Sequence, residues 1–328
     1  MNGGWLKGLS ITLGVAALVA CGTSDQTAGI DRGGATRVVS VVGPITGFGS
    51  IVVNGVHYAV DHAMVEVDGD AGTVADLELG QVVSIVGERD ASGTTGTAAT
   101  VHFLTNVRGP ITALDATTSE LVVLGQKIVV APSTVLDLGA RPAAFSSFMV
   151  GDLIAVSGFV SAHGTIDATW IESVASGAGL LALGVVSGLD SAALSFNLGG
   201  LVVDYSQAVL IEGFASGGPA NGDQVIVKGT SLAPSGALVA REVRHVVDDG
   251  TQPGRETEIE GLITRFVSAL DFDVAGKPVT TTASTTYQGG GAGALLLNVR
   301  VEVAGTADAS GTIVARSIEI DGGSGGDD

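Results

Sequence analysis

Two histidines and two aspartates near the start of the chain have types and spacing that come closest to a catalytic or metal-binding cluster. His57 and His62, together with Asp61 or Asp68, could ligate a metal ion or exchange protons. Residues five apart on a β-strand face opposite sides, however, and no later part of the chain repeats this group. We therefore interpret these four side chains as polar residues of a hairpin.

Other candidate catalytic patterns in the chain are incomplete. Residues 322–326 read G-x-S-x-G, but they lie in a tail that is disordered by composition, and no helix pattern follows them. Asp68 with Asp70, and Asp248 with Asp249, do not match a calcium-binding loop, so we interpret them as solvated turns. No pair among the 34 acidic residues is marked out as an acid and its base. The sequence therefore predicts no catalytic residue, no metal site and no cofactor.

The single cysteine, Cys21, offers a different chemistry. Lys7 is followed by an apolar run, Leu9 to Ala20, which is too short to span a bilayer and has the length of a signal peptide. Leu18, Val19, Ala20 and Cys21 then resemble the lipobox of bacterial lipoproteins. The resemblance implies cleavage before Cys21 and acylation of its thiol by diacylglycerol and palmitate. An ordinary secretory signal is the alternative, but its cleavage site favours a small residue at position 18.

The lipoprotein resemblance also implies an address. Gly22, rather than an aspartate, follows the cysteine, and by the sorting rule of Gram-negative lipoproteins this favours the outer membrane. We expect the lipid bilayer to be a partner through acylated Cys21, with the periplasmic and the surface face both left open. An acylated cysteine cannot act as a nucleophile, and without a second cysteine no internal disulfide forms.

The charge of the chain argues against nucleic acid as a partner. The formal net charge is −19. It becomes −20 once the first twenty residues are removed, because Lys7 is their only charged residue. Such a surface repels phosphates. Aromatic residues are 4% of the chain, so stacking platforms for bases are also scarce, and the same scarcity weakens a carbohydrate-binding interpretation.

An internal repeat organises the rest of the sequence. Its four copies open at Gly43, Gly109, Gly184 and Gly261. Each opening is followed by two apolar residues spaced two apart and then by a glycine, which predicts a strand and a tight hairpin. These apolar pairs are Ile51 and Val53, Leu121 and Val123, Phe196 and Leu198, and Phe272 and Val274.

A second signature follows in every copy, for example GDLIAVSG at Gly151 to Gly158. Its two apolar residues, such as Ile154 and Val156, are again two apart, which predicts that both face the buried side of a strand. The residue between them varies in chemistry, which predicts an outward-facing position. The residues at this position are Ser84, Ala155, Ile226 and Glu302. A closing strand ends each copy, as in TIDATWIES, and an alanine followed three residues later by an apolar residue recurs in it.

These patterns predict an all-β fold of four tandem small antiparallel β-barrels, OB-like in the order of their segments, after a lipoprotein signal peptide. A β-solenoid is the alternative, although solenoid repeats are usually shorter. The predicted organisation is a signal peptide at 1–20, a flexible tether at 21–37, repeats at 38–106, 107–175, 180–249 and 257–321, and a disordered tail at 322–328.

The opening glycine, the central G-x-x-apolar-x-apolar-x-G and the alanine-containing last strand resemble the tandem repeats of the bacterial domain of unknown function 5666 family. The resemblance covers nearly all of residues 42–321. It implies no activity and no functional residues.

The copies differ most in the loop before the second signature. These loops are DGDAGTVADLEL, DLGARPAAFSSFMV, EGFASGGPAN and QGGGAGALLL. Variation of one loop on a repeated scaffold is where recognition is built, so we expect contacts there. The first hypothesis is a non-enzymatic, membrane-anchored envelope protein whose repeats act as a spacer or protein-interaction scaffold. The alternative is a binding protein for a small apolar or glycan ligand, with Trp170 and Phe145 as ligand contacts.

Overall fold

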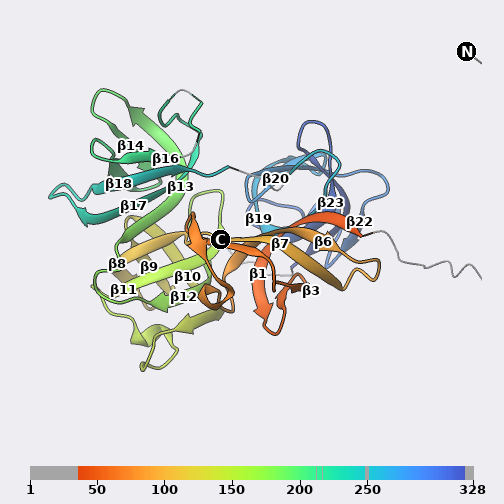
Figure 1. The fold of residues 1–328 in the computed structure, drawn as a ribbon, viewed down its shortest axis with the longest axis horizontal. Helices are drawn as coiled ribbons and strands as arrows, with labels where there is room; N and C mark the ends of the chain where they lie inside the picture. Colours follow the sequence, from red (N-terminus) through yellow and green to blue (C-terminus); the bar gives the residue numbers. More distant parts are fainter. Residues whose placement is uncertain (1–35, 212, 216, 248–250, 322–328) are drawn as a thin grey trace, which may run out of the picture. The chain divides into compact units, whose positions relative to one another are not determined.

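The computed structural model describes residues 36–211, 213–215, 217–247 and 251–321. Over these residues the regular elements are β-strands and three short 3₁₀ turns, η1 (Val74–Asp76), η2 (Phe145–Ser147) and η3 (Ala292–Ala294) (Figure 1). No helix in this part of the chain is long and apolar enough to cross a membrane. The prediction of an all-β chain with four repeats is confirmed. The signal peptide, Cys21, the tail and the tether up to residue 35 lie outside the described residues.

The second repeat shows the arrangement of strands most simply. It consists of β8 (Val107–Asp115), β9 (Glu120–Val123), β10 (Gln126–Asp137), β11 (Leu153–Val160) and β12 (Ile166–Ser173). Strand β8 pairs with β9, β9 with β10, β10 with β12, β12 with β11, and β11 returns to β8. The five strands therefore close into a ring, which leaves no long edge exposed.

The other three repeats form the same ring, but their third strand is broken into two short pieces. The first repeat has β1 (Arg37–Gly47), β2 (Ile51–Val53), β3 (Val56–Ala59), β4 (Met64–Val67), β5 (Asp70–Gly72), β6 (Val82–Arg89) and β7 (Thr95–Phe103). The third has β13 (Leu180–Asp190), β14 (Ser195–Leu198), β15 (Leu201–Asp204), β16 (Val209–Ile211), β17 (Gln224–Leu232) and β18 (Leu238–His245). The fourth has β19 (Glu256–Ser268), β20 (Asp271–Val274), β21 (Lys277–Thr280), β22 (Thr286–Gln288), β23 (Arg300–Ala307) and β24 (Ile313–Ile320). Arg37, which we assigned to the tether, is the first residue of β1.

The prediction that the repeats are antiparallel throughout is wrong at one pairing in each ring. The third strand runs parallel to the last one, as β10 does to β12 and β15 to β18. The first and fourth repeats have the same parallel pair, β3 with β7 and β21 with β24. The reason is that directions cannot alternate all the way round a ring of five strands, so one neighbouring pair must be parallel.

The predicted two-residue periodicity produces the core of each ring. All eight members of the opening apolar pairs, Ile51 to Val274, are at most 1% exposed, and so are Ile154 and Val156 of the second signature. The intervening position is not always solvated as we expected, because Ala155 and Ile226 are buried as well. Ala155 packs into the apolar cluster of the first repeat. Residues that face outward from one repeat are therefore covered by another.

Two glycines of the repeat are explained by close approach of the backbone. A Cβ on the opening Gly109 would lie 2.7 Å from Cγ of Leu124, which occupies the β9–β10 hairpin with a φ of +48°. The last glycine of the second signature, Gly158, sits where the pairing of β11 with β12 shifts register, and its Cβ would lie 2.8 Å from Cα of Ala168. Any larger residue at Gly158 would open this β-bulge.

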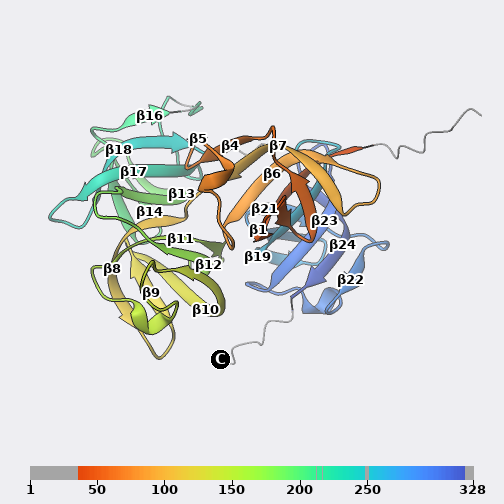
Figure 2. The same ribbon diagram turned by 60° about the horizontal axis from the view of Figure 1, so that its bottom comes forward.

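The repeats are joined to one another by their first strands. Strand β1 pairs in parallel with β19, from Val39 opposite Glu256 to Val42 opposite Ile259. Strand β8 pairs with β13 at Val107 opposite Ala182. Figure 2 shows the β4–β5 hairpin of the first repeat beside β18 of the third, and Lys228 Nζ lies 2.6 Å from Asp70 Oδ2 there. The four rings are therefore connected by sheet pairing and by side chains.

Candidate functional site

His57 and His62 do not lie in a cluster of ligands. Nδ1 of His57 lies 3.1 Å from the hydroxyl of Ser50, across the β2–β3 hairpin. His62 is exposed in the turn that follows. Among the described residues, no three histidine, cysteine, aspartate or glutamate side chains are grouped so that they could hold a metal ion.

The interpretation of Asp68 as a solvated turn residue is wrong, whereas Asp70 is solvated as we expected, with a side chain that is 68% exposed at the start of β5. Asp68 is 5% exposed and accepts hydrogen bonds from the backbone N–H of Thr105 (2.8 Å) and from Arg108 (3.4 Å). Asp70 pairs with Lys228 and Arg244 of the third repeat. Both carboxylates therefore connect the first repeat to its neighbours, which sequence spacing cannot reveal.

The structure separates the two aromatic residues predicted to contact a ligand. Trp170 is 2% exposed and belongs to the apolar cluster of the first repeat, with its ring perpendicular to that of Phe103 at 5.9 Å. Its indole Nε1–H donates to Glu78 at 3.0 Å. Phe145 lies in η2 and packs beside Phe148 on the core of the second repeat. Trp170 thus packs the second repeat against the first. Neither Trp170 nor Phe145 is among the described residues that line the two pockets of this structure.

A groove of about 840 Å³ lies where the first, second and fourth repeats meet, and we call it the junction groove. Its volume falls in the range of small-molecule sites. It is lined by Pro44, Ile45, Thr46, Leu79, Gly80, Val129, Ala131, Ser133, Val135, Phe159, Asp167, Ala168, Thr169, Leu262, Leu297, Asn298, Val299, Arg300 and Asp321. Most of this lining is apolar, and Leu79, Val135 and Leu297 remain 38–43% exposed along it.

The variable loops of the first and fourth repeats end in the junction groove. Leu79 is the last residue of the loop at 68–79 in the first repeat, and Leu297 is the last residue of the loop at 288–297 in the fourth. The second repeat contributes the irregular middle of β10, where the pairing with β12 shifts register between Val130 and Val135. Asn298 accepts a hydrogen bond from Ala162 N at 2.9 Å, which ties the fourth repeat to the second.

Charged groups converge at one part of this groove. Arg300 lies over the ring of Phe159, 4.7 Å from its centroid, and donates to Glu260 from Nε (2.8 Å) and Nη2 (2.5 Å). Its Nε is also 3.8 Å from Asp321. Asp167, on β12, makes no side-chain hydrogen bond or ion pair with any described residue. Burial raises the pKa of Asp167, and the positive charge of Arg300 offsets only part of that rise.

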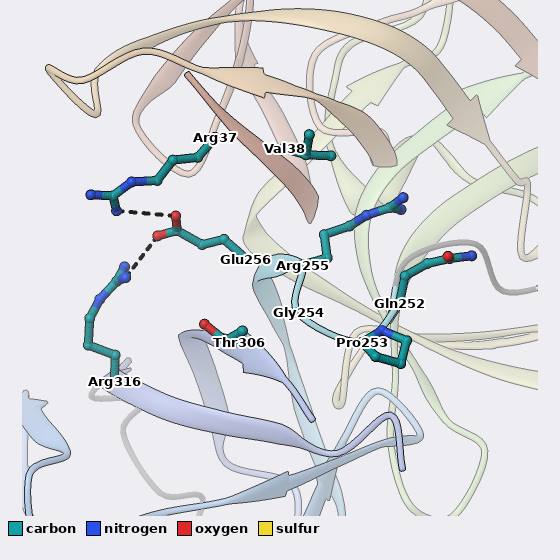
Figure 3. Close-up of a pocket in the computed structure, with 9 residues that line it drawn as sticks. All are labelled: Arg37, Val38, Gln252, Pro253, Gly254, Arg255, Glu256, Thr306 and Arg316. Carbon is teal, nitrogen blue, oxygen red and sulfur yellow. Dashed lines mark hydrogen bonds and ion pairs between the residues drawn. The ribbon is translucent and has the colours of Figure 1, made fainter. Parts of the chain in front are cut away.

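A second pocket of about 660 Å³ lies at the start of β1 and β19 (Figure 3). The carboxylate of Glu256 forms ion pairs with two arginines: its Oε1 lies 2.8 Å from Nη1 of Arg316, and its Oε2 lies 3.4 Å from Nη1 of Arg37. The side chain of Arg255 points away from Glu256. Burial by itself raises the pKa of Glu256, but its hydrogen bonds to Arg316 and Arg37 and their charges lower it below its usual range. Because Glu256 already pairs with two of the arginines, we regard the junction groove as the better candidate site.

The comparison with protein families decides what the repeat is. A family model described as a domain of unknown function (DUF5666) matches residues 39–101, 108–172, 184–244 and 260–319. The chain belongs to the DUF5666 family. No curated protein matches the sequence. The four DUF5666 segments coincide with the four rings of strands, and the junction groove is built by three of them together.

Sequence reasoning missed the polar residues of the groove, although the DUF5666 repeat contains a signal for them. The position of Asp167 is occupied by Thr97, Val239 and Val314 in the other copies. The position of Arg300 is occupied by Val82, Leu153 and Gln224, and that of Phe159 by Glu88, Thr230 and Thr306. Asp167, Arg300 and Phe159 are therefore each a departure from the repeat in a single copy, and the fold brings these departures together.

Proposed function

We propose that this protein is a membrane-anchored envelope lipoprotein whose four repeats act as one rigid, non-enzymatic platform for interaction with another envelope component. The lipobox at Leu18 to Cys21 supports the anchor, with palmitate on Cys21 and the outer membrane as its address. The acidic charge of the chain supports a partner other than nucleic acid.

The observation that carries the platform is the way in which the repeats are joined. A flexible string of domains has few contacts across its linkers, whereas here β1 pairs with β19 and β8 with β13. Trp170 and Ala155 of the second repeat are buried in the apolar cluster of the first. Rigid joints of this kind hold the variable loops in a fixed relation, which suits an interaction scaffold better than a passive spacer.

We further propose that each repeat is a small OB-like barrel. The order of strands around each ring, in which the first strand is followed by the second, third, fifth and fourth, supports this. So does the parallel pairing of the third and fifth strands. The OB-like fold is a five-stranded Greek-key barrel that presents its loops for binding.

The anchor is tested by metabolic labelling with palmitate, followed by membrane fractionation. We expect the wild-type chain to be labelled and recovered with the outer membrane. The Cys21→Ala variant should be unlabelled and released from that fraction. Retention and labelling of the variant would contradict the lipoprotein proposal.

The platform is tested by placing a photo-crosslinking amino acid at single exposed positions in intact cells. Leu79 and Leu297 report on the junction groove, and Val202, which is 47% exposed on β15, is the matched control. We expect the same crosslinked partner from Leu79 and Leu297 and none from Val202. Identical products from all three positions, or none from the groove, would reject the groove as an interaction surface.

A second candidate function, a binding protein for a small apolar ligand, is favoured by the groove itself. A volume of about 840 Å³ with apolar walls and a few converging polar groups has the character of a ligand site. We give the glycan alternative less weight because Arg300 covers the ring of Phe159.

A further inference from the structure

The unpartnered side chain of Asp167 is the most informative feature of the junction groove. It is half-buried on β12, and its carboxylate makes no hydrogen bond or ion pair with any described residue. A carboxylate that has lost part of its water without gaining a partner is costly, and such a group calls for a structural or functional reason. A ligand that donates a hydrogen bond to Asp167 would supply the missing partner.

The other charged side chains around the groove indicate which sign of charge the ligand should carry. Among the described residues that line the groove, Arg300 is the only cation. Glu260 and Asp321 already lie within ion-pair distance of its guanidinium. Asp167 and Asp321 are the acidic lining residues, so the lining carries more negative than positive charge. This balance favours a positively charged group beside Asp167 and disfavours a carboxylate or phosphate.

The apolar residues that line the groove indicate the chemistry of the uncharged part of the ligand. Leu79, Val135 and Leu297 expose apolar surface along the groove, and apolar surface gains when a hydrocarbon body covers it. Sugars stack on open aromatic faces, but the ring of Phe159 is covered by Arg300. Phe159 is the only aromatic residue in the part of the lining that the structure describes. An apolar body therefore fits these walls better than a glycan does.

We propose that the junction groove binds an amphipathic cation, whose hydrocarbon body lies along Leu79, Val135 and Leu297 and whose protonated amine donates to the carboxylate of Asp167. This inference rests on the second candidate function, the binding protein. It deepens that candidate by naming the chemical class of the ligand and the residue that selects it.

The test is isothermal titration calorimetry with three probes of equal chain length, namely octylamine, octan-1-ol and octanoate. The protein is the chain from residue 21 with Cys21→Ala, which carries no lipid and therefore needs no detergent. It keeps all four repeats, which belong to one compact unit. We expect saturable one-to-one binding of octylamine, at least about tenfold tighter than that of octanoate.

Variants assign the binding to the site. Asp167→Asn should weaken octylamine about tenfold and leave octan-1-ol unchanged, since only the charged partner is lost. Asp61→Asn, which removes an exposed carboxylate in a turn outside the groove, is the matched control and should bind like wild type. Leu297→Asn should weaken octylamine and octan-1-ol alike. Asp167→Asn removes a half-buried charge that no described residue pairs with, so we expect its melting temperature to be at least that of wild type.

Several results would overturn the proposal. These are octanoate binding as tightly as octylamine, an Asp167→Asn variant that binds octylamine like wild type, or no saturable binding of any probe. The same outcomes would leave the crosslinks from Leu79 and Leu297 to a protein partner intact. The proposal of a cationic ligand can therefore fail while the proposal of an interaction platform still holds.

Discussion

Glu302 lies on the outer side of β23, directly opposite Glu260 on β19 and Glu319 on β24. Burial raises its pKa to about 7, and the charges of Glu258, Glu260 and Glu319 act in the same direction. Like charges opposite one another across a sheet destabilise it. At the scale of the residue, this position is therefore one where ionisation opposes folding.

Glu302→Gln should stabilise the protein at neutral and alkaline pH but not in acid. The folded pKa of about 7 exceeds the unfolded value of 4.5, so the folded state binds more protons between those values and stability falls as pH rises through that window. After allowance for solvent screening we expect a gain of roughly 1–2 kcal/mol at pH 8 and almost none at pH 4. Urea unfolding at pH 4, 6 and 8 measures it, with the exposed Glu88→Gln as control. A gain that is equal at all three pH values would contradict this account.

Trp170→Ala should cost about 3–5 kcal/mol of unfolding free energy, since it empties a buried site between two repeats. It also leaves Glu78 without its indole donor. Trp170→Phe should recover most of the packing but not that hydrogen bond. Thermal unfolding followed by circular dichroism measures both variants. A loss below 1 kcal/mol for Trp170→Ala would mean that the side chain is not held in the first repeat.

At the scale of the element, the β-bulge at Gly158 joins β11 to β12 in a register that admits no side chain. Gly158→Ala should therefore destabilise the protein by about 2 kcal/mol or more, because backbone atoms rather than a flexible side chain must move. Gly291→Ala is the matched control, since a Cβ there meets nothing within 4 Å and φ is −121°. Denaturant midpoints compare the two, and equal midpoints would show that the bulge can relax.

At the scale of the whole molecule, contacts between repeats predict a single cooperative unfolding transition. Asp68 is buried between the first two repeats, where it accepts a hydrogen bond from Thr105 and pairs with Arg108. The side chain of Asp70 pairs with Lys228 of the third repeat but is 68% exposed. Asp68→Ala should cost about 2–3 kcal/mol and Asp70→Ala less than about 1 kcal/mol. Calorimetry measures both, together with the ratio of calorimetric to van 't Hoff enthalpy, which we expect to be near one in wild type. A ratio well above one would indicate repeats that unfold separately.

The sequence by itself determined the local structure of this protein. Period-two spacing at Ile51 and Val53, and at their counterparts in the other copies, predicted which residues are buried, because strand geometry alternates faces whatever the strand packs against. The glycines of each copy predicted the hairpins and the limits of the repeats, because a tight turn depends only on the few residues that form it. Agreement among four copies made these predictions stronger than any one of them.

Only the tertiary structure decided how the repeats meet and where a site lies. The odd number of strands in a ring required a parallel pair, and packing between repeats buried Ala155 and Asp68, which we had expected to be solvated. The same packing buried Trp170, which we had expected to contact a ligand. The groove arises from Asp167 of the second repeat and Arg300 of the fourth, which lie far apart in sequence. Such a junction depends on the fit of one repeat against another, and residue spacing within a repeat carries no information about that fit.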